Sequence, residues 1–523
     1  MKRKMSFILL FILTFVFTPS FFLGEDTFSL SLEDCIMKAL KNNLQVAVEF
    51  YSPELADVSL TRAKETFMPR FDLSYGTQET ENPSYWWIQG AETVTSKDQN
   101  YSFSFIQQIP TGGNFTLSLS SYKSDTNQSF QLLNPRYGST LRFDFIQPLL
   151  KDFGFKVSRR EIIVAQNNLD ISRSQFKSVL LDTIYKVQEA YWNLVYAIEN
   201  FKVKSQSVEL ARDLLAKNKK EVEVGRLAPI EILNAEAVVA SREAEILQAE
   251  ALIRRNEDLL KNVINISGEG KIVPKRIVPL DKPTFIKEEI SLEEASKQAY
   301  ENRPDLKVKK TDIETKELNL TVAKNQMLPG LNLNLSYWSP GVSGDRLLYL
   351  DDNPFLGIII GKEEGRATDS LRDALKLLYK NWSVGITLSV PLSNVFTRAD
   401  YVRARMELEK SQLELKNIEQ LAMLEVRDAV WEIETSAKIV DAYRVARELA
   451  ERRLEAEEKK LNVGLTTNYF VLQFQEELAN ARSTELKALV DHSLAWAKLE
   501  KALGISLDKR NIKISQFSNS VTQ

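Results

Sequence analysis

The stretch SLEDCIMKALKNNLQVAVEF at residues 31–50 returns as SLEEASKQAYENRPDLKVKK at residues 291–310. A second stretch, KKEVEVGRLAPIEILNAEA at 219–237, returns as EKKLNVGLTTNYFVLQFQE at 458–476. Both echoes keep their order along the chain. A repeat of this length predicts one architectural unit used twice rather than two unrelated domains.

Composition argues against several classes of function for this 523-residue chain. Its 68 basic and 71 acidic residues leave a net charge of −3, which gives no reason to expect nucleic acid as a partner. The single cysteine, Cys35, excludes an internal disulfide, and the single histidine, His492, argues against a histidine-based metal site. We therefore expect no enzyme activity, no cofactor and no metal centre.

The N-terminus has the pattern of a secretory signal peptide. A basic start at 2–4 precedes the apolar stretch SFILLFILTFVF at 6–17, which is too short to span a bilayer comfortably. We assign residues 1–24 to the signal peptide, with Ser20 and Gly24 both open as the last residue removed. No later run of about 20 apolar residues occurs, so an exported chain of this kind stays soluble or enters a membrane as a β-barrel.

Between helical segments the apolar period falls to two, which is typical of strands. Six runs of about ten to twelve residues alternate large apolar with small polar side chains, a length that suits a tilted transmembrane strand. A soluble sandwich would alternate in the same way, but the export signal and the aromatic residues near the strand ends favour lipid. The apolar members are Phe71, Leu73 and Tyr75; Tyr101, Phe103 and Phe105; Phe115, Leu117 and Leu119; Leu141, Phe143 and Phe145; Leu331, Leu333, Leu335 and Tyr337; and Trp382, Val384, Ile386 and Leu388.

Polar linkers of unequal length connect these runs. Residues 77–98 and 121–138 are predicted to be long loops. Residues 339–380 are predicted to be the longest loop, with a short surface helix at 366–380. Long loops on one side and short turns on the other are typical of outer-membrane barrels.

Long helical patterns flank the strands. Residues 29–66 are predicted to form one amphipathic helix that ends before Pro69. From about 155 to 223 no glycine or proline intervenes, and at ~1.5 Å per residue this makes roughly 100 Å of helix. Apolar residues then recur at alternating spacings of three and four, and the same register returns in the second half, which predicts a coiled-coil seam.

Each long helix is expected to end at a glycine, Gly225 or Gly464, placed as a C-terminal cap. A second helix then returns, over about 230–266 in the first half and 467–503 in the second. Each half is therefore predicted to be a strand cluster joined to a long antiparallel helical hairpin.

With this order of elements, the chain resembles the outer membrane efflux protein family, the TolC-type channels, over nearly all of its mature length. Four pairs of stretches carry the resemblance. They are the starts SLEDCIMKALKNN and SLEEASKQAYENRPDL, the strands MPRFDLSYG and LPGLNLNLSYW, the exits QPLLKDFGFKVSRREI and VPLSNVFTRADYVRAR, and the turns VGRLAP and VGLTTN.

The resemblance implies an α+β membrane protein that forms a homotrimer. Strands of three protomers would build one β-barrel in the outer membrane lipid, and their helices would build one coiled-coil tunnel across the periplasm. The implied role is a passive exit duct of a tripartite efflux or type I secretion system, with a periplasmic adaptor and an inner-membrane transporter as partners. The cargo could be a drug, a metal ion or a protein.

The strand count departs from the family pattern, because family members usually give four strands per protomer and six runs are present here. Either the trimeric barrel is wider, or the 101–120 hairpin lies partly outside it. We expect five segments along the chain. They are the signal peptide at 1–24, a first repeat at 25–270, a linker at 271–290, a second repeat at 291–506 and a tail at 507–523.

By position, the resemblance places a periplasmic gate just past the two helical turns. The expected gate side chains are Glu231, Asn234, Phe470 and Gln473. Acidic rings at these positions favour cations in the family, but the second half lacks them. A constriction at Phe470 is one replacement, and Glu476 and Glu477, one turn further in, are another. Glu231 could equally be a solvated carboxylate that the helix dipole favours.

The turns themselves are the expected docking points for the adaptor. They comprise Val224, Gly225, Arg226, Leu227, Val463, Gly464, Leu465 and Thr466. Plain capping by glycine would explain the same pattern, and both roles can hold together. The competing class is a secreted coiled-coil adhesin or envelope spacer, which would account for the heptads but not for six amphipathic strands.

Overall fold

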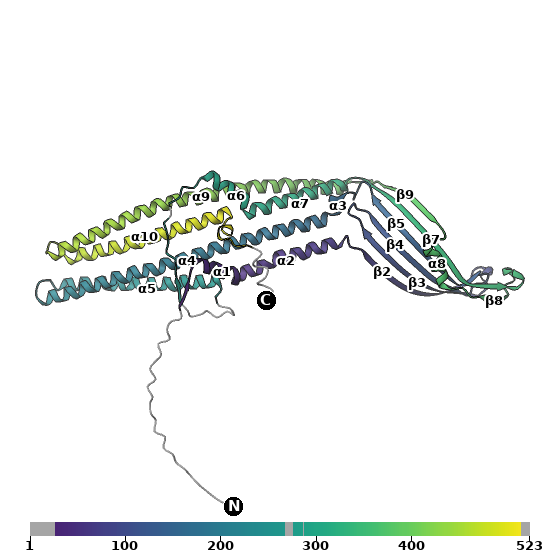
Figure 1. Cartoon of the computed structure of the whole chain (residues 1–523), viewed down its shortest axis with the longest axis horizontal. Coiled ribbons are helices and arrows are strands. Elements are labelled where there is room, and N and C mark those ends of the chain that lie inside the picture. Colours follow the sequence, from purple (N-terminus) through teal and green to yellow (C-terminus); the bar gives the residue numbers. More distant parts are fainter. Residues whose placement is uncertain (1–26, 267–275, 286, 514–523) are drawn as a thin grey trace, which may run out of the picture.

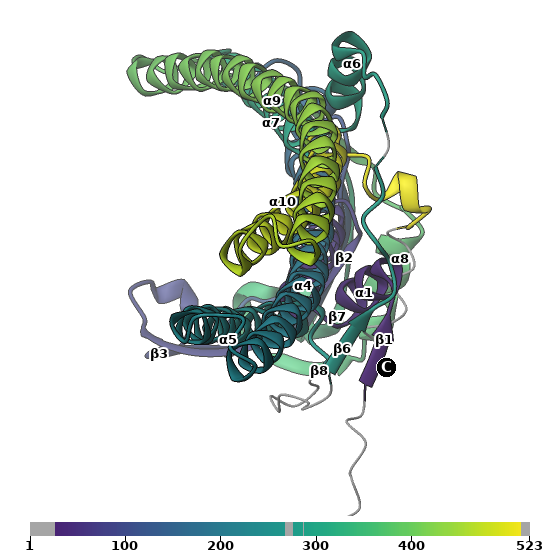
Figure 2. The ribbon, with the colours of Figure 1, turned by 90° about the vertical axis from the view of Figure 1, so that its left-hand side faces the viewer.

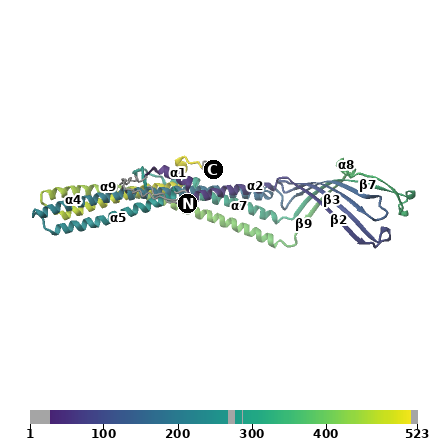
Figure 3. The same ribbon diagram turned by 90° about the horizontal axis from the view of Figure 1, so that it is seen from below.

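The computed structural model describes residues 27–266, 276–285 and 287–513 of the chain. The molecule is elongated, with helices at one end and the large sheet at the other (Figure 1). Figure 3 shows the same division from a second direction. The predicted signal peptide at 1–24 lies outside the described residues.

Two helices run most of the length of the helical part. α4 spans Arg160–Glu223 and α9 spans Val395–Asn462, so each is roughly 100 Å long at ~1.5 Å per residue. Each chain segment then turns back, into α5 (Ile230–Ile264) or α10 (Asn468–Leu503). The two predicted helical hairpins are present, and they meet where α4 packs against α10.

Shorter helices continue this layer toward the sheet. α2 (Leu44–Glu65) packs along α4, and α7 (Pro304–Gln326) packs between α4 and α9. They are preceded by α1 (Leu32–Asn42) and α6 (Leu292–Asn302), while α3 is a single turn at Phe155–Ser158. In end view the long helices form an arc, and α1 and α6 lie on its convex side (Figure 2).

The prediction of one helix over 29–66 is wrong, because the chain bends at Asn43. Ser31 begins α1 with a capping box: its Oγ accepts from the amide of Asp34 at 3.1 Å, and the Asp34 carboxylate accepts from the Ser31 amide at 3.1 Å. Asn43 leaves the helical conformation at the end of α1, and its side-chain oxygen accepts from two amides of the next turn. A second capping residue therefore starts a second helix where periodicity alone predicted continuation.

The large sheet is antiparallel, in the order β2-β3-β4-β5-β7, with β8 and β9 both beside β7. All six predicted runs belong to it, so the 101–120 hairpin is part of the sheet. A separate parallel pair lies among the helices and uses β6 from the predicted linker. The strands are β1 (Thr27–Leu30), β2 (Arg70–Pro83), β3 (Thr93–Gln108), β4 (Asn114–Thr126), β5 (Leu133–Pro148), β6 (Arg276–Pro279), β7 (Gly330–Tyr349), β8 (Ile359–Glu363) and β9 (Asn381–Ser389).

Most of the strands are longer than predicted, and the expected loops are correspondingly shorter. Much of 77–98 and 121–138 is strand, because polar residues continue the ladder beyond the apolar runs. Residues 339–380 contain the end of β7, β8 and the helix α8 (Ala367–Leu375), which confirms the surface helix predicted there. Backbone hydrogen bonds form a ladder whatever the side chains are, so the apolar pattern marks only part of each strand.

Apolar clusters hold the helices together. The largest surrounds the fully buried Tyr191 of α4 and includes Cys35, which packs there as a small buried residue. Leu507 and Ile512, from the predicted tail, belong to the same cluster. A further cluster joins the two hairpins near their turns, with Leu214 from the first hairpin among its members.

Candidate functional site

The turns at the far end of the two hairpins have the same backbone. In the first, the amide of Gly225 donates to Val222 O at 2.9 Å and the amide of Arg226 donates to Glu221 O at 2.8 Å. In the second, the amides of Gly464 and Leu465 make the equivalent bonds, at 3.0 and 2.9 Å. This is the Schellman arrangement, with both glycines in the left-handed region at φ of +74° and +78°. The prediction of glycine caps is confirmed.

The side chains of the two turns differ. In the second turn the Thr466 hydroxyl donates to the Glu457 carboxylate at 2.5 Å, and Lys460 binds the same carboxylate at 3.0 Å. These partners hold the pKa of Glu457 below its ordinary value. In the first turn, Leu227 takes the place of Thr466 and Asn218 takes the place of Glu457. The clamp formed by Thr466, Glu457 and Lys460 is therefore a feature of the second turn and not of the first.

The other turn residues are open to solvent in the single protomer. Val224, Arg226, Val463 and Leu465 are exposed, with Leu465 at 78%. One leucine and two valines at the ends of the hairpins are thus apolar surface that the single protomer leaves uncovered.

The four predicted gate residues lie in or near the first turn of the returning helices. Glu231 is partly buried and sits in the first turn of α5, while Asn234 is exposed. Phe470 is 45% exposed with its ring 5.6 Å from that of Tyr469, and Gln473 is exposed. Among the described residues no hydrogen bond or ion pair joins the two first-hairpin positions to the two in the second hairpin.

The two glutamates considered as substitutes have different surroundings. Glu477 binds Arg453 at 3.2 Å, and Arg453 also lies over the ring of Phe474. Glu476 is exposed. Glu477 is therefore neutralised within its own hairpin, and Glu476 is the better candidate for an acidic position on an open surface.

Sequence reasoning missed the polar contacts that join the hairpins. Arg242 of α5 is only 4% exposed, and its guanidinium donates to Ser207 O of α4 at 2.9 Å and to Leu472 O of α10 at 2.7 Å. Burial lowers the pKa of Arg242. Nearer the turns, the Asn468 amide donates to Asn218 Oδ1 at 2.6 Å. Because the shorter bonds of Arg242 go to backbone carbonyls, and its side-chain acceptor is the uncharged Gln475 at 3.4 Å, no opposite charge in the sequence reveals this link.

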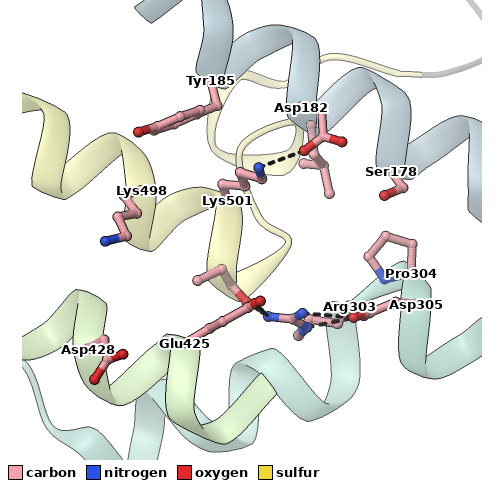
Figure 4. A pocket seen from close by; sticks show the side chains of 12 residues that line it. Ser178, Asp182, Tyr185, Arg303, Pro304, Asp305, Glu425, Asp428, Lys498 and Lys501 are labelled. Atoms are coloured by element: carbon pink, nitrogen blue, oxygen red, sulfur yellow. Dashed lines mark hydrogen bonds and ion pairs between the residues drawn. The ribbon is translucent and has the colours of Figure 1, made fainter. Parts of the chain in front are cut away.

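A pocket of about 450 Å³ lies among the helices, closer to the sheet than the turns are. It is found where α10 ends and α7 begins, between α4 and α9 (Figure 4). Its charged side chains largely neutralise one another. Lys501 binds Asp182 at 2.7 Å, and Arg303 binds Asp305 and Glu425 at 2.7 Å each. These ion pairs hold neighbouring helices together. We therefore interpret the pocket as a structural contact between helices and not as a reaction centre.

Neither a membrane-crossing helix nor a metal cluster is found in the part of the chain that the structure describes. Its helices fall short of the length and apolarity that crossing a membrane requires. Its acidic, cysteine and histidine side chains form no group that could hold a metal ion.

Comparison with known proteins identifies the family. The pattern of the outer membrane efflux protein family matches residues 114–265 and 295–505, which is more than half of the chain. The alkaline protease secretion protein AprF of Pseudomonas aeruginosa is 23% identical over 497 residues, covering 94% of this chain and 88% of that protein. Nodulation protein T of Rhizobium leguminosarum bv. trifolii is 21% identical over 393 residues, covering 75% and 76%.

Solved structures give the same fold. The CmeC outer membrane channel of Campylobacter jejuni superposes with a TM-score of 0.62 at 17% identity, covering 94% of this chain and 89% of that one. The outer membrane protein VceC of Vibrio cholerae gives 0.60 at 15% identity, covering 90% and 96%. With the family pattern matched on both hairpins and the fold shared along its length, this chain belongs to the outer membrane efflux protein family.

Proposed function

We propose that this protein is the outer-membrane exit duct of a tripartite efflux or type I secretion system, assembled as a homotrimer. The observation that carries the proposal is a sheet with two open edges joined end to end to two helices that are each roughly 100 Å long. Cargo passes through such a duct unchanged, so the chain is not an enzyme. A periplasmic adaptor and an inner-membrane transporter complete the system. The likeness to a protein named for alkaline protease secretion makes protein cargo one candidate.

The sheet edges support a barrel shared between protomers. β2 and β9 are the two long edge strands, and apolar side chains such as Leu73 (81% exposed) and Ile386 (69%) cover one face of each. A sheet edge in lipid would leave its amides and carbonyls unpaired at a cost of several kcal/mol each. Pairing β2 of one copy with β9 of the next would close the barrel with six long strands from each of three copies, eighteen in all. Barrels of about this size leave an aqueous channel.

The order of elements supports two repeats. Two helices, strands, a long helix and a returning helix occur from α1 to α5, and the same order occurs from α6 to α10. We keep 25–270 and 291–506 as the repeats, joined by 271–290 and followed by 507–523. The long helices of three copies would form one coiled-coil tunnel from the outer membrane to the hairpin turns.

We place the gate at the turns, since Glu231, Asn234, Phe470 and Gln473 of each copy would surround the narrow end. Conductance in planar bilayers tests this placement. Phe470→Ala is expected to raise the current, and Glu231→Gln is expected to lower the preference for cations. Matched controls at the opposite end of the helices are Phe396→Ala and Glu161→Gln. Variants indistinguishable from their controls would remove the gate from these positions.

Adaptor docking at the turns has a separate test. Single cysteines replace Arg226 or Leu465 in a Cys35→Ala background, and a bifunctional maleimide is added with the adaptor. Crosslinks from both turns, and none from Lys438→Cys in the middle of α9, are expected. A chain that neither forms trimers nor conducts would instead favour a structural coiled-coil protein.

A further inference from the structure

Helix α8 lies directly on the sheet, across β5 and β7. The hydroxyls of Ser139 and Ser370 are 3.1 Å apart and buried. Gly341 of β7 is in such close contact that a side chain there would collide with the carbonyl oxygen of Ser370. Ser339, two residues before it, has no exposed surface. α8 therefore packs directly against a patch of small residues on the sheet, made of Ser139, Ser339 and Gly341.

This patch belongs to the apolar face of the sheet. Successive residues of a strand point to opposite faces, so Ser139 shares a face with Leu141 and Phe143. Arg142 and Asp144, which bind each other at 2.8 Å, occupy the other face. In Figure 2, α8 lies on the convex side of the arc, the same side as α1 and α6. In the proposed barrel, α8 therefore lies on the lipid side.

The strand register gives the depth of α8 in the membrane. Paired residues form rows across the sheet, and one row consists of Phe103, Leu119 and Leu141. The next row outward contains Tyr101, Ser121 and Ser139, and the one after it contains Gln99, Lys123 and Tyr137. Apolar side chains thus give way to tyrosine and then to charge beside α8. Such a change marks the boundary between acyl chains and headgroups.

A groove of about 430 Å³ runs at this boundary between α8 and strands β3 to β5. Tyr101 and Tyr137 line it on the sheet side, and Thr368 and Leu371 line it on the helix side. Of the described residues that line it, Lys123 is the one that carries a charge. Within the described chain the Lys123 ammonium forms no ion pair or side-chain hydrogen bond. The acid that its charge acts on is Asp345 of β7, which is already bound by Lys362 and by the amide of Gly365, at 3.1 Å each.

The outer surface of α8 and of the turn after it has the composition of a helix that lies in a membrane surface. Leu375, Leu378 and Tyr379 are 52%, 58% and 56% exposed. Lys376 and Lys380 lie beside them and are exposed. Exposed leucine and tyrosine next to lysine is the pattern of an interfacial segment that binds anionic lipid.

We propose that this groove binds a phosphorylated lipid of the surrounding leaflet, with an acyl chain between α8 and the strands and the phosphate at Lys123. The inference rests on the proposed function, because it needs this face of the sheet to meet lipid. A tyrosine-lined apolar groove suits the chain of the lipid. The Lys123 ammonium at its polar end suits the phosphate, since no carboxylate lines the groove and Asp345 is bound by other donors.

Native mass spectrometry of the full-length protein in detergent tests the proposal, with added phosphatidylglycerol as the probe. Wild-type protein is expected to retain the lipid, and Lys123→Gln is expected to retain about fivefold less. Lys97→Gln is the matched control, because Lys97 of β3 is on the same face of the sheet as Lys123 but does not line the groove. Diacylglycerol with the same acyl chains, which lacks the phosphate, is expected to bind more weakly and equally to wild type and Lys123→Gln.

Two outcomes would overturn the lipid site. One is equal retention of phosphatidylglycerol by wild type and Lys123→Gln, and the other is equal loss in Lys97→Gln. Ser121→Phe, which fills the groove from its floor, provides a second variant and is expected to reduce retention of both lipids. Failure of the proposed function would look different: the same samples would be monomeric and would carry no current.

Discussion

At the scale of single residues, Arg242 is a buried polar link between the two hairpins. Replacing it with alanine removes charged donors from Ser207 O and Leu472 O, at a cost of about 1.5–3 kcal/mol each in such settings. Arg242→Ala is therefore expected to speed hydrogen exchange where α10 packs on α4. Arg254→Ala is the control, because Arg254 lies on the same helix but is 71% exposed, and its ion pair is with Glu250 of that helix. Equal exchange in the two variants would contradict a bridging role.

Glu457 makes the second turn sensitive to acid. Its hydrogen bond from Thr466 and its ion pair with Lys460 lower its pKa below the ordinary value of 4.5. Because the pKa of Glu457 is lowered in the folded protein, the hydrogen bond and the ion pair stabilise the turn fully above about pH 4.5. This stabilisation is lost as the pH falls through the pKa of Glu457 in the folded protein. Amide exchange at the second turn, corrected for the intrinsic pH dependence, is expected to rise on acidification. Glu457→Gln should remove that rise, and the first turn should not show it.

At the scale of elements, the turn glycines set the shape of both hairpin ends. A left-handed conformation costs a residue with a side chain about 1–2 kcal/mol, so Gly225→Ala and Gly464→Ala are each expected to lose about that much at the turn. Gly76→Ala in β2 is a suitable control, since a side chain there meets nothing within 4 Å. Faster exchange of the Arg226 or Leu465 amide, with the control unchanged, is the expected readout.

Periodicity predicted the type of nearly every element but not its ends. The period of two identified all six long strands, and the spacing of three and four identified both hairpins. The break at Asn43 was missed because a capping side chain overrides a continuous helical pattern. The polar ends of β2 to β5 were missed because ladder pairing such as Glu79 opposite Lys97 needs no apolar residue. The turns of the candidate site were readable from glycine, whereas Arg242 was not.

At the scale of the whole molecule, the six-strand sheet predicts a specific contact between copies. Pairs of cysteines, one in β2 and one in β9, are placed at different positions in a Cys35→Ala background. Those pairs that lie opposite each other across the contact between copies should form disulfide-linked trimers on oxidation. Pairs with one cysteine in β5 should not, because β5 already has neighbours on both sides. Linked species limited to dimers, or none across a full scan of registers, would argue against a closed barrel.

Because the two hairpins have matched lengths, they fix the distance between the sheet and the turns. That distance must match the width of the compartment that the protein crosses. Removing seven residues from α4 would draw its turn back by about 10 Å and keep the apolar seam in phase. The same deletion would then be required in α5, and again in α9 and α10, for the two turns to stay level. Changes in the width of the envelope can therefore be followed only by coordinated, heptad-sized steps in four separate parts of the gene.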